Sequence, residues 1–461
     1  MKKNFGILIL AAGQGTRMKS ALPKVLHHVG GLPMLAHVLK AADSLGPGQI
    51  GVVVGHGAHA VERTVSASLE GWSIKSPVRF IEQKILKGSG RAVQEALPFV
   101  KKFRRLMIIC GDAPLMTGRT LFSLLKLNGS GKSEGVVLTA RVAEPGSYGR
   151  VVRSESGREV AALVEACELG PGAVSNNEIN SGAYVFETKH LVPALRRLKR
   201  KGPKKEFFLT DVIENISSGG GKILPLVTVR ADEIMGVNSR LQLAEANRIF
   251  NARVINELMC SGVTIMDPSS TWIDSGVRIG TDTVILPGTH ISGKTVIGSG
   301  CEIGPCVQIE GCALADNVQI KFGCSLSGSK LLEGATVGPF SHVRPGCRIG
   351  PCAKIGNFSE IKASSIGKGS KVPHLSYVGD TDMGEKVNIG AGTITCNYDG
   401  NAKHRTVIGS GAFIGSNVNL VAPVKVGSWS KIGAGSTITE NVPDSTLALA
   451  RARQIIKTLK R

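Results

Sequence analysis

Aromatic residues are scarce in this chain of 461 residues, at 4% of the total. Acidic residues are also the minority charge, because Lys and Arg outnumber Asp and Glu by 56 to 35 and leave a net charge of +21. Such a balance favours partners that carry phosphate. Nucleic acid is a poor candidate, since no zinc-finger, basic-zipper or aromatic-rich RNA-binding motif accompanies the charge. We therefore expect small phosphorylated substrates and no nucleic-acid partner.

Long apolar runs are missing too. No stretch approaches the roughly 18 consecutive apolar residues that a membrane-spanning helix needs. The apolar run near Met1 leads into Gly-Gln-Gly-Thr-Arg instead of a small-residue cleavage site, so we interpret it as a strand and not as a signal peptide. Ten cysteines are present but no Cys-x-x-Cys pair, which argues against zinc and for a reducing compartment. The sequence predicts a cytoplasmic protein without integral membrane association.

The first half of the chain alternates short apolar segments with helix-like segments. The clearest expected strands are 6–12, 50–54, 106–110 and 136–139. This alternation is typical of a mainly parallel sheet covered by helices. Helical periodicity with few breakers follows from residue 238. We predict an α/β, Rossmann-like domain at 1–237 and a helical linker arm at 238–260.

After Met259 the period changes to six residues. Isoleucine recurs at positions 273, 279, 285, 291, 297, 303 and 309, two further registers cover 337–361 and 408–438, and shorter runs such as Ile320, Leu326 and Leu332 bridge the gaps. Two positions before most of these aliphatic residues stands a small or β-branched residue, so both side chains point to the same face of a short strand. A coil of three such strands buries its inner face only when coils stack. We predict a parallel β-helix at 261–461, with Cys301 and Cys347 as small inward residues.

The first expected strand ends in a glycine-containing loop, Leu10-Ala11-Ala12-Gly13-Gln14-Gly15-Thr16-Arg17-Met18, and Pro23-Lys24 follows. Backbone amides of such a loop, with Arg17 and Lys24, can hold a triphosphate and offset charge that develops during phosphoryl transfer. Asp112 follows another expected strand, where ligands bind in open α/β sheets. One carboxylate is adequate for Mg²⁺, which completes its octahedron with phosphates and water. The alternative for Asp112 is a cap of the following turn.

A second group of polar residues interrupts the six-residue repeat. His374-Leu375-Ser376-Tyr377 stands among aliphatic positions, and Arg344 and Lys362 precede it. Imidazole titrates close enough to neutrality to take a proton from a bound amine, and the neighbouring cations suit a phosphorylated one. The gap between Ile389 and Ile408 contains Asn397-Tyr398. An isolated histidine is more often a surface residue and a gap is often an ordinary insertion, but the two together favour a site.

These motifs resemble known families. The loop at 10–18 with Pro23-Lys24 resembles sugar-phosphate nucleotidyltransferases, and the repeats resemble hexapeptide acyltransferases, which are left-handed β-helices. Further matching segments are Gln83, Gly88-Ser89-Gly90, Tyr148-Gly149-Arg150, Glu165, 178–182, 207–211, 236–238, 374–380 and 388–400. Over its whole length the chain is similar to the bifunctional N-acetylglucosamine-1-phosphate uridylyltransferase and glucosamine-1-phosphate N-acetyltransferase family of bacterial cell-wall precursor synthesis. Gln14, Ser89 and Ala166-Cys167-Glu168 depart from the family pattern, the last near the sugar.

The resemblance implies uridylyl transfer from UTP in the first half, with Mg²⁺ held by Asp112 and Asn238 and with Arg17 and Lys24 in catalysis. The residues that it places around UTP and the sugar are Leu10, Ala11, Ala12, Gly13, Lys24, Gln83, Gly88, Ser89, Gly111, Asp112, Gly149, Glu165, Asn180 and Asn238.

For the second half the resemblance implies acetyl transfer from acetyl-CoA to glucosamine 1-phosphate, with His374 as the base and a homotrimer formed through the β-helix. Around the amino-sugar phosphate it places Arg344, Lys362, Tyr377 and Asn388, and around acetyl-CoA it places Ala391, Asn397, Tyr398, Ser416, Ala434 and Arg451; Asn397 and Tyr398 also approach the sugar phosphate. The alternative is a single-activity sugar-1-phosphate nucleotidyltransferase whose β-helix is structural or regulatory.

Overall fold

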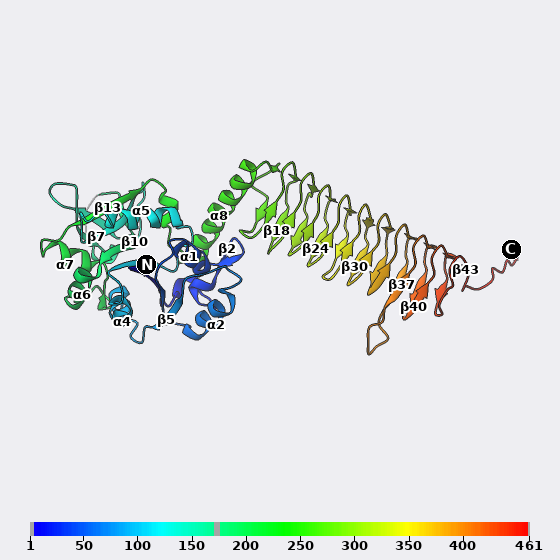
Figure 1. The fold of residues 1–461 in the computed structure, drawn as a ribbon, viewed down its shortest axis with the longest axis horizontal. Helices are drawn as coiled ribbons and strands as arrows, with labels where there is room; N and C mark the ends of the chain where they lie inside the picture. Colours follow the sequence, from blue (N-terminus) through cyan, green and yellow to red (C-terminus); the bar gives the residue numbers. More distant parts are fainter. Residues whose placement is uncertain (1–3, 170–175, 460–461) are drawn as a thin grey trace. The chain divides into compact units, whose positions relative to one another are not determined.

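The computed structural model describes residues 4–169 and 176–459. The chain divides into two compact units, Met1–Phe250 and Asn251–Arg461, with the boundary inside helix α8 (Arg240–Cys260) (Figure 1). No described helix combines the length and the apolar character that a bilayer-spanning segment needs.

The first unit is built on a sheet whose main path runs in the order β13-β7-β10-β6-β1-β4-β5. The bounds are β1 (Phe5–Ala11), β4 (Ile50–Val54), β5 (Val78–Glu82), β6 (Arg105–Cys110), β7 (Gly135–Arg141), β10 (Glu178–Glu187) and β13 (Ile223–Thr228), and the hairpin of β8 (Arg150–Arg153) and β9 (Val160–Val164) joins β10. On this path of described strands β10 runs antiparallel to both neighbours, and the other pairs are parallel. The mainly parallel sheet predicted from the sequence is confirmed.

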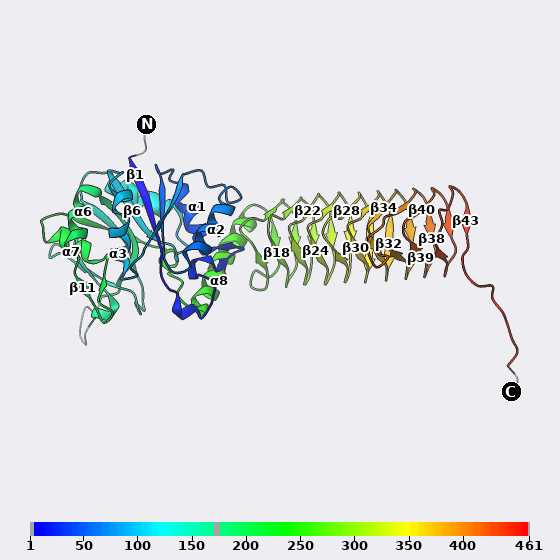
Figure 2. The ribbon, with the colours of Figure 1, turned by 90° about the horizontal axis from the view of Figure 1, so that it is seen from below.

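Helices cover both faces of this sheet, as Figure 2 shows. Alternate side chains of β1 explain why, because a strand presents successive residues to opposite faces: Ile7 and Ile9 are buried on one face and Leu8 on the other. The first face packs against α1 (Met34–Asp43), α2 (Ala58–Ser68) and α5 (Gly118–Asn128). The second packs against α3 (Ser89–Glu95), α4 (Leu97–Val100), α6 (Thr188–Arg196) and α7 (Asp211–Ser217).

The second unit is the parallel β-helix that the six-residue period predicts. Among the described residues its short strands form three parallel sheets of 11, 10 and 9 strands. The sheets begin at β14 (Thr264–Ile265), β15 (Trp272–Ile273) and β16 (Arg278–Ile279) and end at β43 (Leu447–Ala448), β42 (Thr437–Ile438) and β40 (Val424–Val426). Within each sheet a strand pairs with the third strand after it, except that β41 pairs with β43, so a coil has three sides. The paired positions 273 and 291, or 285 and 303, stack aliphatic residues in register.

The structure corrects the predicted register in three places. Leu331, not Leu332, points inward. Leu314 also occupies an inward position that the six-residue count misses. Thr395 is buried in the gap that the sequence leaves after Ile389, so the excursion from the helix is shorter and covers 397–405. In the first two cases a side of the coil is five residues long, and in the third a threonine replaces the aliphatic residue.

Ile349 in β28 (Arg348–Ile349) tests the contribution of one inward residue. It is fully buried between Leu331 and Ile366 of the adjacent coils. We expect Ile349→Ala to lower the stability of the β-helix by about 2–5 kcal/mol, because lost burial adds to the cost of a cavity. Thermal unfolding of the full chain measures the loss, and Arg348→Ala on the exposed face is the control. Equal melting temperatures for the two variants would contradict the assignment.

A buried histidine joins α1 to its surroundings in the first unit. Nε2 of His37 lies 2.7 Å from the carbonyl oxygen of Val29, to which it donates, and its ring packs against Phe250 with centroids 4.6 Å apart. Burial lowers the pKa of His37 to about 4, against a smaller opposing effect of the hydrogen bond to Val29. The folded protein therefore keeps this ring neutral.

His37 should make the first unit sensitive to acid. Its folded pKa lies below the unfolded value of 6.5, so its contribution is complete above pH 6.5 and is lost as the pH falls toward 4, by about 3 kcal/mol in total. We expect His37→Gln, which retains an N–H donor but does not titrate, to lose less stability than the wild type between pH 7 and 4.5. Melting temperatures at several pH values measure this. Parallel curves for both proteins would show that His37 has no such effect.

Candidate functional sites

A cavity of about 730 Å³ lies at the carboxyl ends of β1, β5 and β6. The loop from Leu10 to Arg17 leaves β1, Gln83 follows β5 directly, and Asp112 follows β6. In a parallel sheet these ends meet at one edge, which is where the sequence places a ligand. The predicted residues that line the cavity are Leu10, Ala11, Ala12, Gly13, Arg17, Lys24, Gln83, Gly88, Ser89, Asp112 and Asn238.

Two glycines allow the walls of the cavity to approach each other. Gly15 has φ +62°, and a Cβ there would lie 2.8 Å from Cβ of Lys24. Gly88 has φ +94°, and its Cβ would lie 2.4 Å from the carbonyl oxygen of Phe207. Only glycine suits both the left-handed backbone and the close contact.

Lys24 is the central cation of the cavity. Its ammonium forms a short ion pair with Asp112 and donates to Oδ1 of Asn238 at 2.8 Å. Asp112 and Asn238 therefore face one positive charge from two sides. A carboxylate and an amide oxygen are ligands that Mg²⁺ accepts, so the donor set fits the metal that the sequence predicts there. In the described chain no group of three or more His, Cys, Asp or Glu residues could hold a metal, and substrate phosphates would have to complete the shell.

Three predicted residues form a separate group beside the cavity without lining it. The backbone N–H of Asn180 donates to the carbonyl oxygen of Gly149 at 2.9 Å, and a Cβ on Gly149 would lie 3.7 Å from Oε2 of Glu165. Burial raises the pKa of Glu165, while a hydrogen bond from Thr210 opposes the rise. Gly111, also predicted, donates through its N–H to the carbonyl oxygen of Leu10 at 2.9 Å, which supports the loop and not the cavity wall.

Sequence reasoning missed several residues of the cavity. The ones it did not assign to a site are Val25, Leu86, Lys87, Ala92, Cys110, Lys204 and Glu206, whereas Gln14, Gly15 and Thr16 belong to the predicted phosphate loop. Lys204 and Glu206 come from the hairpin of β11 (Arg200–Lys201) and β12 (Glu206–Phe207), which is joined to the 83–88 loop by the hydrogen bond from Phe207 N–H to the Lys87 carbonyl at 2.9 Å. No sequence signal indicates this contact between distant segments.

On the β-helix, His374 ends β32 (Lys371–His374) at a corner of the coil. Its Nδ1 lies 2.7 Å from Oδ1 of Asn357 on the preceding coil. Because an amide oxygen only accepts, this contact places the proton of the neutral ring on Nδ1 and leaves the lone pair on Nε2. The ring is exposed, so Nε2 can receive a proton from a bound molecule.

Three residues predicted to contact acetyl-CoA continue the column that His374 begins. Ala391, Ser416 and Ala434 stand at the same corner of successive coils, each two positions after an inward isoleucine. Asn417 N–H donates to the Ala391 carbonyl at 2.7 Å and Gly435 N–H to that of Ser416 at 2.8 Å, which keeps the coils in register. Arg451 Nη1 donates to the Ala434 carbonyl at 2.9 Å. Asn388 in β35 (Asn388–Ile389) lies on the coil after Lys371.

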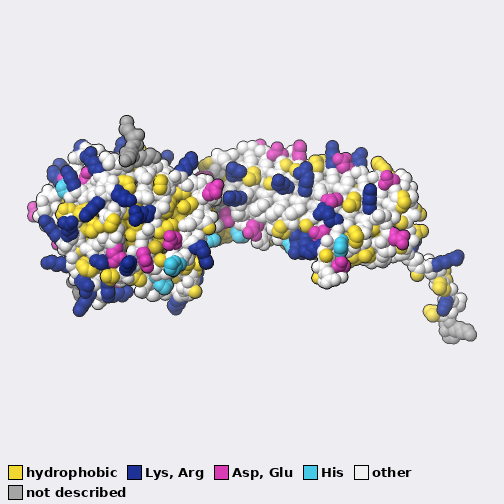
Figure 3. Space-filling model, turned by 60° about the horizontal axis from the view of Figure 1, so that its bottom comes forward, with side chains coloured by type: hydrophobic (Ala, Val, Ile, Leu, Met, Phe, Trp, Pro, Cys, Tyr) yellow, Lys and Arg dark blue, Asp and Glu magenta, His cyan; other side chains and the backbone are white. Residues whose placement is uncertain are grey.

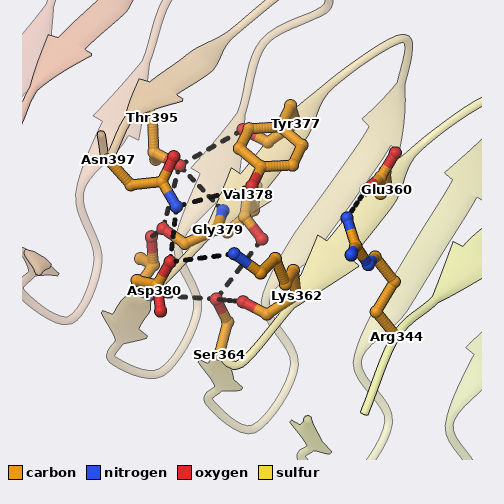
Figure 4. Close-up of polar contacts among 11 residues, drawn as sticks. Arg344, Glu360, Lys362, Ser364, Tyr377, Val378, Gly379, Asp380, Thr395 and Asn397 are labelled. Atoms are coloured by element: carbon orange, nitrogen blue, oxygen red, sulfur yellow. Dashed lines mark hydrogen bonds and ion pairs between the residues drawn. The ribbon is translucent and has the colours of Figure 1, made fainter. Parts of the chain in front are cut away.

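The remaining predicted residues form a cluster at the next corner of the coil (Figure 4). Nη1 of Arg344 lies 3.0 Å from Oε1 of Glu360, and Nζ of Lys362 lies 3.6 Å from Oδ2 of Asp380. Asn397 donates to Asp380 through a short hydrogen bond and to the Tyr377 hydroxyl at 3.4 Å. Within the described residues no hydrogen bond or ion pair joins His374 to this cluster. Glu360 and Asp380 were not assigned from the sequence.

The excursion at 397–405 projects below β37 (Thr406–Ile408) in Figure 1. An isolated bridge between Tyr398 and Lys403 closes it, and Asp399 pairs with His404 at 2.6 Å. Backbone N–H groups of Ala402 and Asn401, with His404, hold the pKa of Asp399 below its usual range. The neighbouring amino group of Lys362 lowers the pKa of Lys403, because the two groups repel each other when both are charged. Figure 3 shows Lys and Arg side chains gathered beside this projection.

Comparisons with known proteins cover both units. A model of the MobA-like NTP transferase domain matches residues 7–211, and one of the bacterial transferase hexapeptide (six repeats) matches 276–311, 328–363 and 405–440. The bifunctional protein GlmU of Heliobacterium modesticaldum is 46% identical over 452 residues, or 98% of this chain and 96% of the relative. This chain belongs to the GlmU family. The GlmU proteins of Pelobacter propionicus and a Geobacillus species are 45% and 43% identical over 98% and 99% of this chain, in each case 97% of the relative.

Membership of the GlmU family confirms three predictions from the sequence. They are the family itself, the α/β nucleotidyltransferase fold followed by a left-handed hexapeptide β-helix, and an enzyme with two transferase activities. The residues assigned to each site stay predictions, which the geometry above groups into one cavity and two corners of the β-helix.

Proposed function

We propose that this chain acetylates glucosamine 1-phosphate with acetyl-CoA and then transfers a uridylyl group from UTP to the N-acetylglucosamine 1-phosphate, releasing pyrophosphate. We assign the uridylyl transfer to residues 1–237, the linking arm to 238–260 and the acetyl transfer to 261–461. One observation carries the proposal: the same chain holds both sites. The contacts of Lys24 with Asp112 and Asn238 lie at a sheet edge, and His374 lies at the corner of the β-helix where Ala391, Ser416 and Ala434 follow it. The ten cysteines are free thiols, which suits the cytoplasmic location that we infer.

In the uridylyl reaction the chain positions phosphates and balances charge. The 10–13 backbone and Gln83 enclose the nucleotide, and Arg17 and Lys24 face the phosphates. The sugar phosphate oxygen attacks the α-phosphorus in line, and pyrophosphate leaves. Mg²⁺, held by Asp112 and Asn238, would neutralise phosphate charge. The ammonium of Lys24, which contacts both residues, can then turn to the phosphates without a protein nucleophile being needed.

In the acetyl reaction His374 acts as the general base. Nδ1 donates to Asn357, so Nε2 is the atom that removes the proton from the sugar ammonium. The freed amine attacks the thioester carbonyl, and CoA leaves as the thiol. Arg344 and Lys362 supply positive charge for the sugar phosphate, and the Ala391–Ser416–Ala434 edge holds the coenzyme with Arg451 near its phosphates.

We further propose a homotrimer in which neighbouring chains complete each acetyl site. His374 and Asp380 lie at successive corners of the coil, and among the described residues no hydrogen bond or ion pair joins them, whereas reacting groups must approach to about 3–3.5 Å. An exposed apolar column lies at the His374 corner: Phe322 meets Phe340 edge to face with centroids 4.9 Å apart, and Phe340 stacks on Phe358 with centroids 5.4 Å apart. Apolar surface of this kind is typical of an interface. A second copy that covers it brings its own residues to His374.

Two variants test the two activities against each other. We expect His374→Ala to lower acetyl transfer by about 100-fold or more, since general bases contribute about 10²–10⁴-fold, and to leave uridylyl transfer unchanged. Asp112→Asn should lower uridylyl transfer by about 100-fold and leave acetyl transfer unchanged. Acetyl transfer is measured as thiol release from acetyl-CoA with glucosamine 1-phosphate. Uridylyl transfer is measured as pyrophosphate release with UTP and N-acetylglucosamine 1-phosphate. Pyrophosphate without any thiol from the wild type would instead support a single-activity enzyme with a structural β-helix.

Mixed assemblies test the shared site. His374→Ala and Lys362→Ala should each be inactive in acetyl transfer alone. We expect that unfolding them together and reassembling them restores part of the activity, because some sites then combine an intact histidine from one chain with an intact lysine from another. Light scattering should give a mass of three chains. Mixed trimers that stay inactive would show that each chain supplies both residues to its own site.

A further inference from the structure

Asp380 occupies the centre of the polar cluster at the second corner of the β-helix. It follows β33 (Tyr377–Gly379), and its N–H donates to the carbonyl oxygen of Lys362 at 2.9 Å. Its Oδ2 forms an ion pair with Nζ of Lys362 at 3.6 Å and accepts a hydrogen bond from the side-chain N–H of Asn397 (Figure 4). One carboxylate oxygen thus joins the coil that precedes Asp380 to the coil that follows it.

This carboxylate is sheltered. The side chains of Lys362 and Asp380 are 17% and 16% exposed, and Asn397 is buried. A largely buried charge needs an opposite charge or hydrogen bonds, and removing one member of the ion pair leaves the remaining charge poorly compensated. The Lys362 ammonium and the Asn397 amide are therefore held in place before any ligand arrives.

Asp380 also fixes which way the Asn397 amide faces. A carboxylate only accepts hydrogen bonds, so Nδ2 of Asn397 points to Asp380 and to the Tyr377 hydroxyl, and Oδ1 is turned away from both. Tyr377 can take part because Gly379 has no side chain: a Cβ there would lie 2.5 Å from the Tyr377 hydroxyl. The amide oxygen of Asn397 is thereby presented as an acceptor for an N–H or O–H group.

We propose that Asp380 is a positioning residue of the acetyl-transfer site, which holds Lys362 for the phosphate and Asn397 for an N–H or O–H donor of the amino sugar. This inference rests on the proposed acetyl transfer to an amino-sugar phosphate. Of the two contacts predicted for Asn397, with acetyl-CoA and with the sugar phosphate, the proposal takes the second. It therefore predicts an effect of Asp380 on recognition of the sugar phosphate and not on the coenzyme, for which Ala391, Ser416 and Ala434 are predicted at the other corner.

Two substitutions separate the side chain of Asp380 from its backbone. Asp380 has φ +49°, a conformation that glycine and asparagine adopt most readily. Asp380→Gly therefore removes the carboxylate without straining the turn, and Asp380→Asn keeps an acceptor oxygen and removes the charge. The matched control is Asp382→Ala in β34 (Thr381–Met383). Asp382 also joins a coil to the excursion, through Arg405 at 2.5 Å, but it is half exposed and does not contact Lys362 or Asn397.

Steady-state kinetics with glucosamine 1-phosphate and acetyl-CoA test the proposal on the full chain. We expect Asp380→Gly to raise the KM for glucosamine 1-phosphate about tenfold and Asp380→Asn about threefold, since charge-assisted contacts are roughly twice as strong as neutral ones. The KM for acetyl-CoA, the uridylyl activity and all kinetic constants of Asp382→Ala should stay within about twofold of the wild type.

Three results would overturn this role. The first is a KM of Asp380→Gly for glucosamine 1-phosphate that equals that of Asp382→Ala. The second is an equal rise of both KM values, and the third is a fall in kcat alone with a lowered melting temperature; a structural role would produce either of these. If Asp380→Gly does not fold, Asp380→Asn decides by the same criteria. A wild type that releases no thiol would reject the acetyl transfer itself and this inference with it.

Discussion

Stacking of inward aliphatic residues in register is the constraint on which the second unit depends. Each fully buried residue of this kind contributes roughly 1.5–3 kcal/mol, and none is buried unless the coils above and below are present. Register follows from the hydrogen bonds between coils, such as Leu375 N–H to the Asn357 carbonyl. Positions that lie two residues after the inward residues of one sheet therefore recur at the same corner of successive coils. His374, Ala391, Ser416 and Ala434 form one edge for this reason, although up to 60 positions separate them in the sequence.

The first unit reaches its site by a different route. Its central strands β1 and β4 and most of β6 are apolar and buried on both faces, and polar residues follow where these strands end. Asp112 follows β6 with only Gly111 between them, and the 10–17 loop begins at the end of β1. The edge of a parallel sheet therefore brings together groups from distant parts of the sequence without any of them being repeated. Positive φ at Gly15 and Gly88 then allows backbone to approach side chain closely.

Periodicity predicted most of the fold because the physical signal is local. Six-residue spacing identified the β-helix, and the alternation of strands and helices identified the α/β unit. Leu331 and Thr395 were missed as inward residues. A side of five residues, or a buried threonine in place of isoleucine, still closes the coil but breaks the six-residue pattern of aliphatic residues. Cavity residues such as Lys204 and Glu206 were beyond local reasoning, since only the contact between Phe207 and Lys87 brings their hairpin to the cavity.

Both sites hold their cations with carboxylates before substrate binds. Lys24 contacts Asp112, Lys362 contacts Asp380, and Arg344 contacts Glu360. A free lysine or arginine carries about 2 kcal/mol of side-chain rotamer entropy, and a carboxylate partner offsets part of the cost of ordering it in advance. A phosphate must then compete with that carboxylate, which weakens ground-state binding but fixes the geometry in which charge is balanced. The net charge of +21 attracts phosphorylated molecules from a distance. The net positive charge therefore attracts the substrates from a distance, whereas the carboxylates orient the lysine and arginine side chains within the sites.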